Sequence, residues 1–228
     1  MSARALWRMM GLSPIPVLVT VVPAGALLAA VAIVGVFFGV DVGRLLHDPA
    51  AVAGMNPLIG LVSNLGVLLW AAAASICLFT AALTRRRGMH EAFAFTFCAG
   101  LLSAYLMLDD LFMFHENLVE RYIGMSEKAL YLCLGIATLV FLIRFRFFIL
   151  RTDFGYLLLA LGFLAASVLV DTAADYAVPV FAEKFPMLED IAEDGSKWLG
   201  IAFWACYYLR SCYQVAVDPE RFTVPTAV

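Results

Sequence analysis

The sequence predicts an all-α, polytopic membrane helix bundle with six transmembrane helices, and three observations support this class. Of the 228 residues, 64% are hydrophobic and only 14% are charged, whereas soluble globular domains have about 45–50% apolar and about 25% charged residues. The apolar residues form six runs that approach the length of a bilayer crossing. Lys and Arg gather in alternate connections between these runs. We therefore expect a single transmembrane domain over residues 1–228.

The first three spans are defined by their length and by the charges that end them. Residues 1–16 contain Arg4 and Arg8, as a signal peptide would, but the following run of roughly 24 apolar residues is longer than a signal-peptide core of about 7–15 residues. The second span is rich in Ala and Gly and stops at three consecutive arginines, and the third ends with Asp109 and Asp110. The six spans are predicted over about 17–40, 58–83, 92–115, 128–150, 154–178 and 188–210.

The last three spans follow the same logic. The fourth ends where arginines alternate with aromatic residues, and the fifth is apolar until Asp171. The apolar part of the sixth, Trp198 to Arg210, is too short to cross a bilayer, which takes about 20 residues. This helix must therefore begin near Asp190, which places Glu193 and other charged residues within the outer third of the membrane, where an ionised group is costly unless it is paired, hydrated or ligated.

The charge distribution predicts that both termini are cytoplasmic. Ten Lys and Arg residues lie at the N-terminus, in alternate connections and in the C-terminal residues, together with four acidic residues; the opposite side has five and fourteen. By the positive-inside rule, the arginine-rich side is cytoplasmic. The chain is thus predicted to be a multi-pass protein of the inner (plasma) membrane, with a loose cytoplasmic tail over residues 211–228.

Acidic residues mark the outer ends of spans three, five and six, so we expect these residues to converge beneath the outer surface. Carboxylates bind hard divalent cations, and a histidine widens the choice of metal. The sequence therefore predicts a cation or divalent-metal site, in which one lysine compensates part of the charge. The metal-ligand candidates are Asp109, His115, Glu116, Asp171, Asp175 and Glu193. The candidates for a catalytic role are Asp110, Asp194 and Lys197.

The pattern leaves several functions open. Bound metal or a carboxylate base would suit hydrolase-like chemistry on a lipid or another interfacial substrate. Intramembrane acids and a lysine also suit a proton or cation transporter, although spans three, five and six have few polar residues in their inner halves. The third alternative is a structural subunit of a larger membrane complex. Membrane lipids are the expected partners, an oligomer or a partner membrane protein stays open, and the net charge of −3 argues against nucleic acid.

Overall fold

The computed structural model describes residues 14–113, 124, 127–176 and 186–222. These residues form helices and turns, with no strand among them. The chain divides into two compact units, residues 1–59 and 60–228, where the sequence analysis predicted one domain. The predicted all-α class is confirmed.

The first unit contains helix α2 (Pro14–Phe38) and two short helices, α3 (Val42–Leu46) and α4 (Pro49–Ala53). The short helices lie between the first two predicted spans. Each begins at an aspartate side chain that accepts hydrogen bonds from backbone N–H groups: Asp41 caps α3 and Asp48 caps α4. Such caps satisfy N–H groups that the first turn of a helix leaves without partners.

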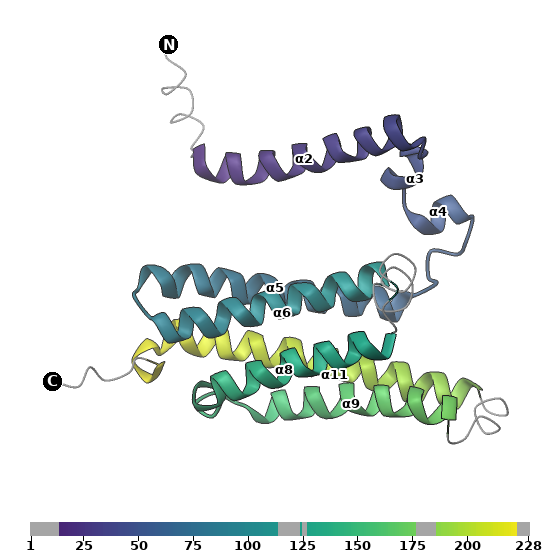
Figure 1. Ribbon diagram of the computed structural model, residues 1–228. Helices are drawn as coiled ribbons and strands as arrows, with labels where there is room; N and C mark the ends of the chain where they lie inside the picture. The colour runs from purple at the N-terminus through teal and green to yellow at the C-terminus, as the bar shows by residue number, and fades with distance from the viewer. Residues whose placement is uncertain (1–13, 114–123, 125–126, 177–185, 223–228) are drawn as a thin grey trace, which may run out of the picture. The chain divides into compact units, whose positions relative to one another are not determined.

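The second unit is a bundle of five long helices, α5 (Leu61–Arg86), α6 (His90–Phe112), α8 (Glu127–Ile149), α9 (Gly155–Tyr176) and α11 (Pro186–Val217). Figure 1 shows these helices lying side by side along a common direction. The most extensive contacts join α5 to α6 and α9 to α11, and α5 also packs on α11. Contacts between α8 and α6 are much sparser.

Two glycines allow the closest helix contacts in the bundle. A Cβ on Gly100 of α6 would lie 3.2 Å from the backbone nitrogen of Leu78 on α5. A Cβ on Gly200 of α11 would lie 3.0 Å from the backbone nitrogen of Leu164 on α9. Small residues at such crossings let membrane helices pack backbone to backbone.

The core lies toward the end of the bundle where the α5–α6 turn and the start of α9 meet, which we call the arginine end because it bears Arg85–Arg87 and Arg151. Phe95 of α6 is completely buried there against the rings of Phe141, Phe145 and Phe148 of α8, at centroid distances of 4.4–5.6 Å. The opposite end, where α6 and α9 finish and α11 begins, is the pocket end.

Within the described part of the chain, five helices are long and apolar enough to cross a membrane: α2, α5, α6, α8 and α9, each over most of its length. The predicted sixth span corresponds to α11, whose first half is too charged to meet the same standard. Many large apolar side chains on the bundle surface are exposed, including Leu132, Val140 and Leu158, as expected of helices that face lipid. The structure is therefore consistent with a membrane protein. Among the described residues, five helices rather than the predicted six meet the requirements for a span.

The C-terminal prediction is wrong for residues 211–222. The α11 helix does not stop at Arg210 but continues to Val217, and a 3₁₀ turn, η2 (Pro219–Phe222), follows. Cys212, Val215 and Phe222 are all buried. Arg210 does not end the helix because its side chain reaches sideways to Asp153, with Nε 2.7 Å from Oδ2.

Candidate functional site

The pocket end of the bundle contains a cavity of about 380 Å³ lined by all five long helices. The lining residues lie near one end of most of these helices, so the cavity is closer to the pocket end than to the middle of the bundle. Its charged lining consists of Asp109, Asp110, Asp171, Glu193, Asp194 and Lys197. Among the side chains that the structure describes, five carboxylates therefore share the cavity with one ammonium group.

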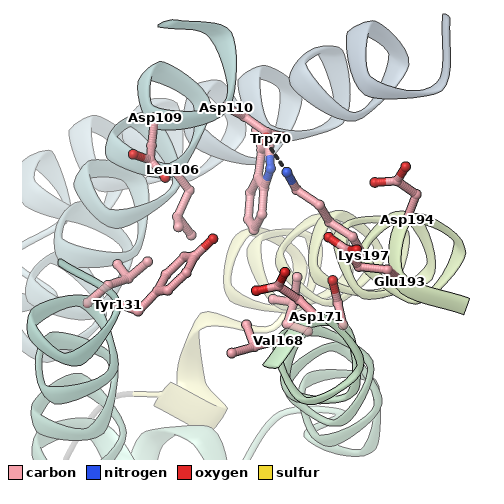
Figure 2. A pocket seen from close by; sticks show the side chains of 13 residues that line it. Trp70, Leu106, Asp109, Asp110, Tyr131, Val168, Asp171, Glu193, Asp194 and Lys197 are labelled. Atoms are coloured by element: carbon pink, nitrogen blue, oxygen red, sulfur yellow. Dashed lines mark ion pairs between the residues drawn. The ribbon is translucent and has the colours of Figure 1, made fainter. Parts of the chain in front are cut away.

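An ion pair links α6 to α11 across this cavity. The Nζ atom of Lys197 lies 2.6 Å from Oδ1 of Asp110, and Figure 2 shows the lysine reaching across to that carboxylate. The Asp110 side chain is only 7% exposed and that of Lys197 is 36% exposed. The second oxygen of Asp110, Oδ2, is buried and has no hydrogen-bond partner among the described residues. Since a carboxylate oxygen buried without a donor is costly, Asp110 is suited to accept one more hydrogen bond.

The remaining carboxylates are spread around the cavity. In Figure 2, Asp109 lies on the side of Tyr131, whereas Glu193 and Asp194 lie on the side of Lys197. Asp109 is almost entirely buried, and Asp171 approaches from α9. Asp109 and Asp110 are consecutive on α6, as are Glu193 and Asp194 on α11, and the packing of α6, α9 and α11 brings the two pairs and Asp171 to one cavity.

Aromatic side chains form part of the cavity wall and its floor. Trp70 of α5 and Tyr131 of α8 both line the cavity. Trp70 packs edge-on against Trp204 of α11, with ring centroids 5.4 Å apart. The Trp204 Nε1 atom donates a hydrogen bond of 3.0 Å to Ser103 Oγ on α6. This contact fixes the floor because it ties together the two helices that carry Asp110 and Lys197.

Six of the nine candidates from sequence line this cavity, and the other three cannot be assessed. His115 and Glu116 lie outside the described residues, as does the side chain of Asp175. Among the residues that the structure describes, no group of three His, Cys, Asp or Glu side chains is placed to hold a metal ion. The predicted metal site is thus not supported, because the carboxylates come from different sides of a wide cavity and Lys197 occupies the position beside Asp110.

Sequence reasoning assigned no part in the site to the uncharged lining residues, among them the aromatic residues Trp70 and Tyr131. Both are uncharged, and neither has a charged neighbour in the sequence that would have marked it. The available signal was topological: the start of α5 and the start of α8 must lie at the same end as Asp109 and Asp110.

The expectation of an apolar inner half is also incomplete. The half of the bundle toward the arginine end contains buried Thr80, Thr84, Thr152 and Ser211 and the buried pair Tyr207 and Tyr208. The threonine hydroxyls donate mainly to carbonyls of their own helices, whereas Thr152 Oγ1 also lies 3.0 Å from the Tyr207 hydroxyl. The Tyr208 hydroxyl is buried with no hydrogen-bond partner among the described residues. Thr80 and Thr84 lie on α5 and Thr152 lies in the turn between α8 and α9, whereas Tyr207 and Tyr208 belong to predicted span six itself.

Comparison with protein families gives one match. A family model described as a domain of unknown function, DUF8692, matches residues 17–211. Because this match covers most of the chain, the chain belongs to that family. A search of curated proteins found no match. A search of solved structures found none either.

Proposed function

We propose that this chain is an integral protein of the inner (plasma) membrane and that its pocket binds a small organic cation carrying an ammonium group. The observation that carries this proposal is the described lining of the pocket, in which five carboxylates and one lysine share about 380 Å³. Charged residues are rare at membrane depth and mark functional sites there. The charge excess favours a cationic guest.

An organic ammonium ion fits this pocket better than a bare metal ion. The volume falls within the roughly 300–1,000 Å³ typical of small-molecule sites. Trp70 and Tyr131 line the pocket, and the faces of aromatic rings attract ammonium groups by cation–π interaction. Asp110 already accepts an ammonium group, that of Lys197, at 2.6 Å. The described residues, by contrast, offer no set of three metal ligands.

Hydrolysis of an interfacial substrate has weaker support. A carboxylate such as Asp194 could act as a base, but the described lining offers no set of three metal ligands, and its lysine, Lys197, is already paired with Asp110. Binding requires only the charge and shape that the pocket already has.

Transport of a proton or cation is the second candidate, and one observation favours it. The Tyr208 hydroxyl is fully buried without a hydrogen-bond partner among the described residues, between the pocket and the arginine end. A buried hydroxyl of this kind is commonly satisfied by an ordered water. A chain of such waters past Tyr207 and Thr152 would extend the polar path that starts at the pocket.

Binding is tested on the full-length protein in nanodiscs with tetramethylammonium and a choline-headed amphiphile as probes, read by calorimetry and by fluorescence of the tryptophans. We expect saturable binding that Asp171→Asn and Glu193→Gln each weaken about tenfold, or about 1.4 kcal/mol. Asp218→Asn, which removes an exposed acid at the arginine end, is the control and should bind normally.

Lys197→Met provides a sharper test of the same proposal. It removes the internal ammonium group that competes for Asp110, so ligand affinity should rise. If the affinity of Lys197→Met for the ammonium probes were unchanged or lower, Lys197 would not compete with the ligand for Asp110. Saturable Ca²⁺ or Mn²⁺ binding without any ammonium binding would favour a metal site, and ammonium-dependent charge movement in proteoliposomes would favour transport.

A further inference from the structure

A second cavity lies at the arginine end, on the outer face of the α5–α6 pair. It has a volume of about 550 Å³ and is lined by Leu78, Ala81, Ala82, Arg85, Arg86, Phe93 and Phe97. None of its lining residues belongs to the pocket described above. We call it the Arg85 groove.

Residue size explains why the groove forms. Ala81 and Ala82 of α5 are small and leave space between larger neighbours. On α6, Phe93 stacks on Phe97 with ring centroids 5.6 Å apart and an interplanar angle of 23°, which makes a flat apolar wall. Leu78 and Phe97 are both partly exposed. The groove therefore presents a continuous apolar surface along the helix pair.

One end of the groove is cationic and the rest is apolar. The Arg85 guanidinium lies 5.7 Å from the centre of the Phe93 ring, and Arg86 is exposed beside it. No carboxylate lines the groove, and no ion pair joins Arg85 or Arg86 to a described acid. Glu91, in the first turn of α6, is not part of the lining. The adjacent Arg87 is used elsewhere, since its Nη1 donates to the carbonyl of Ala216.

We infer that the Arg85 groove binds one anionic phospholipid from the leaflet at the arginine end, given that the bundle is embedded in a membrane as proposed above. The lipid phosphate pairs with Arg85 and Arg86, because guanidinium groups bind phosphate through two parallel hydrogen bonds. One acyl chain lies along Ala82, between Leu78 and Phe97. Basic groups at this membrane level attract anionic lipids in general, and the groove adds a specific place for the tail.

The experiment uses the full-length protein in detergent micelles, with native mass spectrometry as readout. Phosphatidylglycerol and phosphatidylcholine with identical acyl chains are the probes. We expect the wild-type protein to retain one phosphatidylglycerol at concentrations where phosphatidylcholine is not retained. Arg85→Gln with Arg86→Gln should reduce this retention at least fivefold.

The matched control is Arg144→Gln with Arg146→Gln. These two arginines lie at the same end, over the rings of Phe145 and Phe147 of α8, and line no part of the groove. Equal losses in the two double variants would overturn the proposal, because they would indicate attraction to net charge alone.

A further variant tests the tail. Ala82→Trp fills the exposed groove and keeps both arginines, so it should also abolish selective retention. Normal retention in Ala82→Trp, or displacement of the lipid by millimolar inorganic phosphate, would overturn a lipid site in favour of a simple phosphate site. Thermal stability of each variant is measured in parallel. If the Arg85 and Arg86 double variant does not fold, the single Arg86→Gln replaces it, because Arg86 is exposed.

Discussion

The two ends of the bundle are built from the same five helices but in opposite ways. Toward the arginine end, aromatic rings such as Phe95, Phe145 and Tyr208 fill the interior, and their side chains are buried. At the pocket end the helices enclose a cavity with six charged side chains. The comparison shows that the two halves differ in role. The close-packed half stabilises the fold, and the other half contains charged side chains that would be destabilising in a close-packed core.

The largest expected effect comes from the aromatic core. Phe95→Ala removes a completely buried ring that contacts three phenylalanines of α8, and should lower the free energy of unfolding by about 3–5 kcal/mol. Phe79→Ala on the lipid-facing surface, where the ring is 69% exposed, is the control. Thermal unfolding in detergent measures both, and equal losses would mean that the arginine half is not the stabilising half.

The next prediction is that the same substitution, glycine to alanine, changes stability in opposite directions at two positions. Gly200→Ala places a Cβ 2.7 Å from Leu164 Cγ and 3.0 Å from its backbone nitrogen, and should destabilise by about 1–3 kcal/mol through overpacking. Gly162→Ala on α9 meets nothing within 4 Å, so it should stabilise by roughly 0.5 kcal/mol because alanine is the better helix former. The same sign for both would argue against a close α9–α11 contact.

A smaller effect is expected for the ion pair of the pocket. In a double-mutant cycle of Asp110→Asn and Lys197→Met, the coupling energy should be about 1 kcal/mol, since the partly exposed lysine weakens the attraction by solvent screening. Chemical denaturation of all four proteins measures it. A coupling indistinguishable from zero would show that Lys197 neutralises the pocket only through its net charge.

The smallest effect belongs to the surface pair at the arginine end. The hydrogen bonds from Arg210, and then the one from Gln214, lower the pKa of the Asp153 carboxyl below its ordinary value. A lowered folded-state pKa stabilises the protein above the unfolded-state pKa, and this contribution is lost as the pH falls through the lowered value. Asp153→Asn should thus shift the midpoint of melting at pH 7 by no more than about 2 °C.

The pH dependence checks the sign of this last prediction. The difference in melting temperature between the wild-type protein and Asp153→Asn should shrink as the pH is lowered from 6 to about 3. A difference that grows in acid would mean that the aspartate is not held in its ionised form by Arg210.

Much of the fold can be predicted from sequence because a long apolar segment in a membrane must form its backbone hydrogen bonds internally, which favours a helix. The predicted spans overlap all six long helices, with ends displaced by about two residues in most cases. The exception is α11, which passes Arg210 because an arginine side chain can leave the helix surface and pair with Asp153. Charge patterns cannot distinguish an arginine that ends a helix from one that pairs across helices.

The site was predictable only in part. The acids of α6, α9 and α11 could be expected at one end, since antiparallel helices return there. Which side chains point toward one another could not, because it depends on the rotation of each helix about its axis. That rotation brings Asp110 to Lys197 and adds Trp70 and Tyr131, two residues without any charge to reveal them.

The attachment of α8 has a consequence for how a guest would reach the carboxylates. All of its buried side chains, from Phe141 to Ile149, are in its second half, whereas no described side chain before Phe141 is buried. The first half, which contributes Tyr131 and Leu134 to the cavity wall, is therefore less tightly packed than the second half of the same helix. A sideways displacement of this segment would open the cavity directly to the hydrocarbon phase, so that an amphiphile could deliver its head group while its tail stays among the lipids.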